Sequence, residues 1–150
     1  MEKPDQGSVK LNFDGFVRNG STAIGFTIRD DRGNPMISAC KQIGDASVLV
    51  AEATTLRDGL HIVCLNHLKN VIVDGDSKLL VDSLTGKAEV PWRIKTLVSD
   101  ILTLAQQCHS IVFRHIFREA NFLLINLLVM ATRILHLLYG STVSHFCVPS

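Results

Sequence analysis

A chain of 150 residues is long enough to form one domain with a buried core. Hydrophobic residues make up 47% and charged residues 19%, which excludes a disordered chain and indicates a globular one. The formal net charge is +1, from 15 basic and 14 acidic residues, so any basic surface for nucleic acid must be local.

The cysteines and the start of the chain indicate the cellular compartment. No two cysteines are close enough in sequence to form a CxxC metal or redox motif. The first residues, MEKPDQGSVK, lack the apolar segment of a signal peptide. We therefore expect reduced thiols and an intracellular protein, in the nucleus or the cytoplasm.

The first part of the chain predicts three strands and a helix. Residues 9–17, 22–30 and 35–43 alternate apolar and polar side chains and are separated by short Gly and Asn turns, which is typical of an antiparallel meander. In residues 47–66, apolar side chains recur at spacings of three and four, which predicts an amphipathic helix.

The second part predicts alternating strands and helices. Residues 70–76 form an apolar run bounded by acids, as in a buried parallel strand, and residues 77–84 form a short helix. The spacing of apolar residues predicts a further helix at residues 92–108, a fifth strand at residues 110–117 and a final helix from residue 119 to about 138.

This order, β-β-β-α-β-α-α-β-α, predicts an α/β fold with a five-stranded mixed sheet flanked by helices. We assign residues 1–8 to a lead-in, 9–138 to a single domain and 139–150 to a C-terminal tail.

Three acidic residues stand where the pattern makes acids unfavourable. Glu52 lies at the edge of the apolar stripe of its helix, where a carboxylate needs a partner or a metal. Asp14 interrupts the first strand, and Asp76 ends the fourth strand, at the strand end where open α/β sheets bind ligands. Taken singly, each has an ordinary explanation as a capping, surface or strand-end acid.

Taken together, the three acids indicate a metal site. Converging carboxylates repel one another unless cations neutralise them, and oxygen ligands on rigid elements suit Mg²⁺ or Mn²⁺. Two such ions can promote phosphodiester cleavage by activating a water and stabilising the leaving oxygen. We expect no small-molecule cofactor.

Several segments resemble the ribonuclease H-like domain common in plants, the reverse transcriptase-like group often found in retroelement-derived proteins. Together they span roughly residues 9–122 in the family's order. The matching segments are KLNFDG, GNP, AEATTLRDGLHIV, VIVDGDSKLLVDSL, PWRIKTLVSDI and HIFREAN.

The resemblance implies a fold, an activity and a set of residues. The fold is that of ribonuclease H, and the activity is metal-dependent endonuclease cleavage of the RNA strand of an RNA–DNA hybrid. Asp14, Glu52 and Asp76 match the catalytic and metal-binding acids, while Asp74 matches a position with no catalytic role.

The resemblance also suggests contacts with nucleic acid. Arg118 and Asn121 fit the family's motif R-E-x-N-x-x-A-D-x-L, and His115 stands where related enzymes have a loop histidine. These three residues are the predicted nucleic-acid contacts. For His115, strand alternation favours a position in the core or on the sheet surface, so both readings stay open.

The fourth acid of the family motif is missing. Its position holds Ile125, whose side chain cannot bind a hard cation. Three hypotheses follow: a ribonuclease H-type nuclease with impaired activity, a catalytically inactive module that binds nucleic acid or protein, and a membrane-associated or degenerate product. The third comes from the apolar residues 122–139, which more plausibly pack on the sheet than span a membrane.

Overall fold

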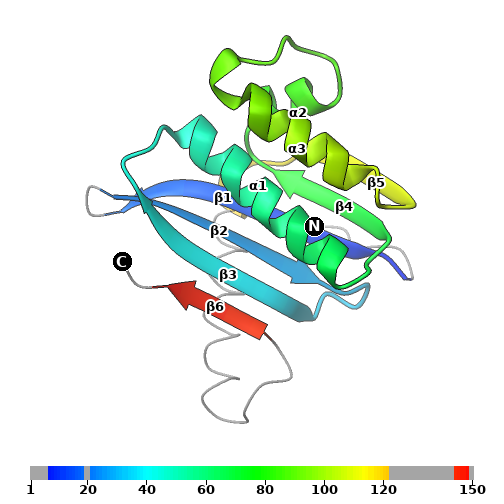
Figure 1. The fold of residues 1–150 in the computed structure, drawn as a ribbon. Helices are drawn as coiled ribbons and strands as arrows, with labels where there is room; N and C mark the ends of the chain where they lie inside the picture. The colour runs from blue at the N-terminus through cyan, green and yellow to red at the C-terminus, as the bar shows by residue number, and fades with distance from the viewer. Residues whose placement is uncertain (1–6, 19–20, 122–143, 149–150) are drawn as a thin grey trace.

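A mixed sheet forms the centre of the molecule. The computed structural model describes residues 7–18, 21–121 and 144–148. The strand order across the sheet is β5-β4-β1-β2-β3-β6 (Figure 1). The strands are β1 (Val9–Arg18), β2 (Ser21–Arg29), β3 (Pro35–Gly44), β4 (Asn70–Gly75), β5 (Ser110–His115) and β6 (Ser144–Val148).

Strand β1 occupies the middle of the sheet. It runs antiparallel to β2 and parallel to β4, with Asn12 opposite Asp74 in the β1–β4 register. Strand β5 continues the parallel half, with Asp74 opposite Arg114 and Gly75 opposite His115. The carboxyl ends of β1, β4 and β5 therefore lie at one edge of the sheet.

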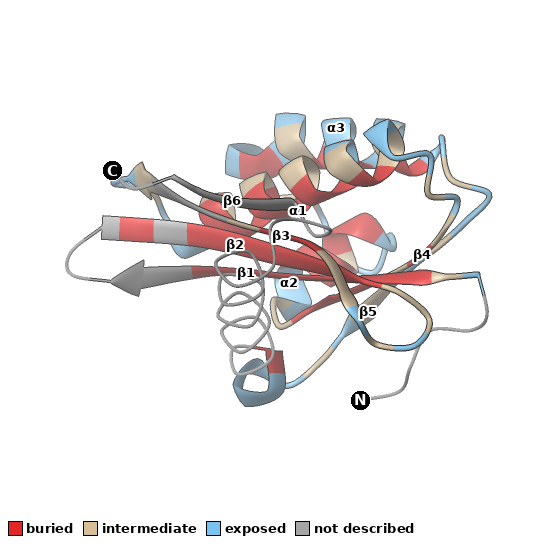
Figure 2. Ribbon diagram, turned by 90° about the horizontal axis from the view of Figure 1, so that it is seen from below, coloured by how far each residue is buried: buried red, intermediate tan, exposed pale blue. Residues whose placement is uncertain are grey.

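The helices form a layer on one face of the sheet. Helix α1 (Val48–Leu65) lies over β1 and β2 and runs roughly along them, and α3 (Lys95–Ala105) packs beside it (Figures 1 and 2). The short helix α2 (Lys78–Leu84) and the 3-10 turn η1 (Trp92–Ile94) connect β4 to α3. Ser47 begins α1 by accepting a hydrogen bond from the backbone N–H of Val50.

The two faces of β1 differ in chemistry. Val9, Leu11 and Phe13 belong to the apolar core, which α1 completes with residues such as Leu56 and Leu60. The alternate positions of β1 point to the other face, because successive side chains in a strand alternate. These are Lys10, Asn12 and Asp14, all polar and all buried.

Most predicted elements are confirmed, with three differences. Strand β5 ends at His115 rather than residue 117, and the helix predicted at 92–108 consists of η1 followed by α3. Strand β6 was not predicted: it lies in the expected tail and adds a parallel neighbour to β3. The final predicted helix begins as expected, since residues 118–121 are helical, but its continuation from residue 122 and Ile125 lie outside the described residues.

The apolar residues 122–139, from which the membrane hypothesis came, lie outside the described residues, so that hypothesis stays a prediction. In the part of the chain that the structure describes, no helix combines the length and apolar character needed to cross a bilayer.

Candidate metal centre

Asp14 lies on β1, next to the residue that contacts the first turns of α1. Its side chain is only 4% exposed. The next residue, Gly15, faces α1, and a Cβ atom there would stand 2.9 Å from the Cβ of Ala51 and 3.0 Å from the backbone nitrogen of Glu52. The absence of a side chain at Gly15 therefore lets the first turns of α1 approach Asp14.

This close approach gives a testable expectation. Gly15→Ala should push α1 away from β1, lowering stability by about 1–3 kcal/mol and weakening divalent-metal binding. Calorimetric titration with Mn²⁺ and urea unfolding measure the two effects. Gly59→Ala is the matched control, since its added methyl meets the side chain of Leu11 farther along the same interface. Unchanged Mn²⁺ affinity in Gly15→Ala would contradict this role.

Glu52 and Asp76 approach Asp14 from two other elements. Glu52, in the second turn of α1, is 4% exposed although it is a carboxylic acid among alanines. Asp76 directly follows β4, and Ser77 caps α2 by accepting a hydrogen bond from the backbone N–H of Leu80. The Ser77 side chain also hydrogen-bonds the carboxylate of Glu52, so the α2 cap helps to orient that acid.

The three acids predicted from the sequence converge. One carboxylate oxygen from each of Asp14, Glu52 and Asp76 lies within 4.8 Å of the other two. These residues come from β1, α1 and the end of β4, so the sheet and its helix layer bring them together. Their separation in the chain means that local structure alone cannot explain the cluster.

The electrostatics of the cluster favour a cation. Burial, followed by the neighbouring charge of Asp76, raises the pKa of Asp14 to about 7. Burial is also the main cause that raises the pKa of Glu52 to about 7, although its hydrogen bond with Ser77 acts in the opposite direction. A divalent ion would reverse both shifts, because it favours the charged carboxylates.

The donor set fits Mg²⁺ or Mn²⁺. All three side chains offer hard oxygen ligands, and their oxygens are close enough to share an ion. Asp14, Glu52 and Asp76 could therefore hold a divalent cation. The described residues offer no nitrogen or sulfur ligand to this cluster.

Two polar side chains contact Asp76 from the end of β5 and the residues after it. His115 is exposed, and its Nε2 lies 3.1 Å from the backbone oxygen of Asp76. The His115 side chain is therefore at the sheet surface rather than in the core. Arg118 Nε lies 3.4 Å from the Oδ2 of Asp76. Phe117, which belongs to the strand predicted at 110–117, lies beyond the end of β5 and is 81% exposed.

Asn121 ties the following segment to the central strand. Its side-chain amide donates a 2.7 Å hydrogen bond to the backbone oxygen of Phe13, and its Oδ1 accepts one of 3.3 Å from Asn12. Asn121 is fully buried in this arrangement. Its amide thus has a structural role, and contact with nucleic acid stays a prediction for it.

Asp74 has a different environment from the three clustered acids. It is 0% exposed and accepts hydrogen bonds of 2.9 and 3.1 Å from the guanidinium of Arg114. The buried ammonium of Lys10 lies 3.4 Å from its Oδ2. Asp74 is thus part of an ion cluster joining β1, β4 and β5, and its noncatalytic position stays a prediction of the sequence resemblance.

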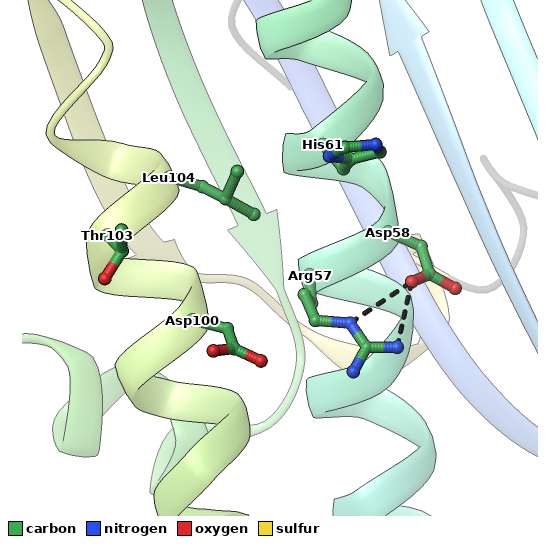
Figure 3. Close-up of a pocket in the computed structure, with 6 residues that line it drawn as sticks. All are labelled: Arg57, Asp58, His61, Asp100, Thr103 and Leu104. Atoms are coloured by element: carbon green, nitrogen blue, oxygen red, sulfur yellow. Dashed lines mark hydrogen bonds and ion pairs between the residues drawn. The ribbon is translucent and has the colours of Figure 1, made fainter.

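A separate groove lies between α1 and α3, with a volume of about 350 Å³ (Figure 3). Arg57 and Asp58 on its wall bind each other at 3.2 Å, and His61 and Asp100 also line it. None of these residues belongs to a group of potential metal ligands within the described ranges. The converging carboxylates remain the candidate site.

Comparisons with known proteins agree with this geometry. The chain resembles ribonuclease H1 of the archaeon Halobacterium salinarum, with 22% identity, a TM-score of 0.72, and coverage of 83% of this chain and 98% of that one. It also resembles the N-terminal ribonuclease H domain of a Mycobacterium tuberculosis protein, with 25% identity, a TM-score of 0.71, and coverage of 77% and 91%.

A third similar structure contains a nucleic acid. It is the LC11 ribonuclease H1, isolated from compost, in complex with an RNA/DNA hybrid, with 26% identity, a TM-score of 0.67, and coverage of 75% of this chain and 88% of that one. A search of proteins with curated functions found no significant match.

The sequence profile of the reverse transcriptase-like family matches residues 12–127, most of the chain. This range includes all three clustered acids, while the wider domain limits of 9–138 stay a prediction. The chain belongs to the reverse transcriptase-like family and has a ribonuclease H-like fold.

Proposed function

We propose that this protein is a metal-dependent ribonuclease that hydrolyses the RNA strand of RNA–DNA hybrids. The observation that supports this best is the convergence of Asp14, Glu52 and Asp76 within 4.8 Å. The three acids would hold Mg²⁺ or Mn²⁺ and are the proposed catalytic residues. Bound there, the metal supplies an activated water and charge stabilisation for phosphodiester cleavage.

The chain's own residues would prepare and orient this site. Ser77 holds the Glu52 carboxylate from the start of α2, and Gly15 allows α1 to place Glu52 beside Asp14. The buried walls around Asp14 and Glu52 exclude bulk water, which strengthens electrostatic interactions.

The rim of the site has the chemistry of a nucleic-acid contact. Arg118 provides a guanidinium, His115 an exposed imidazole and Phe117 an exposed ring, all at the edge where Asp76 lies. Cations contact phosphates, and exposed aromatic rings stack on bases. We propose that this rim, defined as His115, Phe117 and Arg118, contacts the hybrid. The hybrid-bound LC11 ribonuclease H1 supports this class of partner.

The isoleucine at position 125 supports a second candidate function. If the fourth acid is indispensable, the chain is a noncatalytic module that binds nucleic acid through the same face. We propose residual activity instead, because the three described acids are enough to bind one divalent ion.

A cleavage assay distinguishes the two. Purified protein is incubated with an RNA–DNA hybrid labelled on the RNA strand, in Mg²⁺, in Mn²⁺ and in chelator. Metal-dependent cleavage of the RNA that disappears in Asp14→Asn would support the enzyme, and Ile125→Asp should then increase the rate. Salt-sensitive hybrid binding without any cleavage would support the module and rule out the enzymatic proposal.

A further inference from the structure

Arg118 places a positive charge directly against the acidic cluster. Its Nε lies 3.4 Å from the Oδ2 of Asp76. The charge also acts on the other two acids, because it lowers the pKa of both Asp14 and Glu52, although burial outweighs it in each case. One guanidinium thus influences all three carboxylates.

The two partners of this ion pair differ in their freedom to move. The Asp76 carboxylate is 2% exposed, whereas the Arg118 side chain is 71% exposed. Asp76 is fixed between the end of β4 and the cap of α2, while Arg118 lies beyond the end of β5. The guanidinium can therefore move into solvent without disturbing the core, and the carboxylate cannot follow it.

A divalent ion and the Arg118 guanidinium would compete for the Asp76 carboxylate. An ion shared by the three acids would need the Asp76 carboxylate and would lie within a few ångströms of the guanidinium. Two cations at that separation repel each other strongly where water is partly excluded. Each of them also reduces the repulsion among the carboxylates, so the guanidinium partly compensates the negative charge of the site when no metal is bound.

We propose that Arg118 is a built-in counter-cation that neutralises the metal-free carboxylates and is displaced when a divalent ion binds. This inference rests on the proposed metal site and adds a competitor to it. The displaced guanidinium stays at the rim, where it can contact a phosphate. Metal loading would then prepare the rim for nucleic acid.

Metal affinity gives the first test, and it needs no activity. Calorimetric titration with Mn²⁺ should show that Arg118→Met binds roughly 2- to 5-fold more tightly than the natural protein, a range set by the modest strength of exposed ion pairs. Arg118→Lys keeps the charge and should stay near the natural affinity. Arg32→Met removes an exposed arginine from the distant β2–β3 turn and controls for net charge. Unchanged or weaker binding in Arg118→Met would overturn the proposal.

Thermal unfolding in chelator gives a second, metal-free test. At neutral to mildly alkaline pH, Arg118→Met should melt at a lower temperature than both the natural protein and Arg32→Met, because the carboxylates lose their counter-charge. An equal or higher melting temperature would contradict the proposal.

Failure of the proposed function and failure of the proposed role of Arg118 give different results. If the natural protein binds no Mn²⁺ and Asp14→Asn behaves identically, the proposed function fails, and the melting experiment still decides the role of Arg118. If the natural protein binds Mn²⁺ and Arg118→Met does not bind it more tightly, only the counter-cation fails.

Discussion

Replacing Asp74 by Asn should destabilise the protein by about 3–5 kcal/mol, the usual effect of removing one partner from a buried ion pair. Asp74 is fully buried and faces the guanidinium of Arg114 and the ammonium of Lys10, which is itself fully buried. Burial lowers the pKa of Lys10, and the charge of Asp74 opposes this effect. Without the carboxylate, the two cations on β1 and β5, the strands on either side of β4, lose the anion between them.

Urea unfolding at neutral pH measures this effect. The matched control is Asp82→Asn, which removes the same charge from an exposed pair with Lys78 on α2. That change should alter the free energy of unfolding by less than about 1 kcal/mol. If Asp74→Asn were as mild as its control, the ion cluster would not be a structural element of the sheet.

The stability of the metal-free protein should fall as the pH rises through about 7. Asp14 and Glu52 have a pKa of about 7 in the folded state, raised from ordinary values of 3.8 and 4.5. A carboxyl with a raised pKa adds stability that is fully present below its unfolded pKa and is lost above its folded one. For one such group, the loss is on the order of 4 kcal/mol.

Unfolding in chelator at about pH 5 and about pH 8 tests this sign. The natural protein should lose more stability between the two than Asp14→Asn, whose neutral amide removes one titrating group. Mg²⁺ or Mn²⁺ should restore stability at the higher pH and have little effect at the lower one, where protons compete for the carboxylates. Equal pH dependence in the two proteins would show that Asp14 does not titrate as described.

The sequence was sufficient to predict the three clustered acids because each one stands at a position where the local pattern disfavours an acidic side chain. An acid in a central strand, an acid beside an apolar helix stripe and an acid at a parallel strand end are visible in the sequence alone. The order of elements and the resemblance then placed them together. Asp74 also stands at a position that disfavours an acid, but it belongs to a buried ion cluster. An acid at such a position therefore indicates either a functional site or a buried ion pair.

Other features depended on contacts that no local pattern encodes. The pairing of Arg118 with Asp76 joins residues from two different connections, and its distance of 3.4 Å follows from where β5 ends. Alternation extended that strand by two residues and so misplaced Phe117. The hydrogen bond from Ser77 to Glu52 depends on how α1 and α2 pack. The sequence identifies Ser77 as a residue at a helix start but does not identify its partner on α1.

The parallel pairing of β1 with β4 also determines when the acidic cluster can exist during folding. Asn12 and Asp74 are opposite each other in the register, yet β2, β3 and α1 all lie between them in the chain. Closing so long a segment delays this contact relative to the local meander. We therefore expect Asp76 to reach Asp14 after the meander has formed, so that the ligand set is completed late in folding. A metal bound at this site would act on the finished fold, mainly by slowing its unfolding.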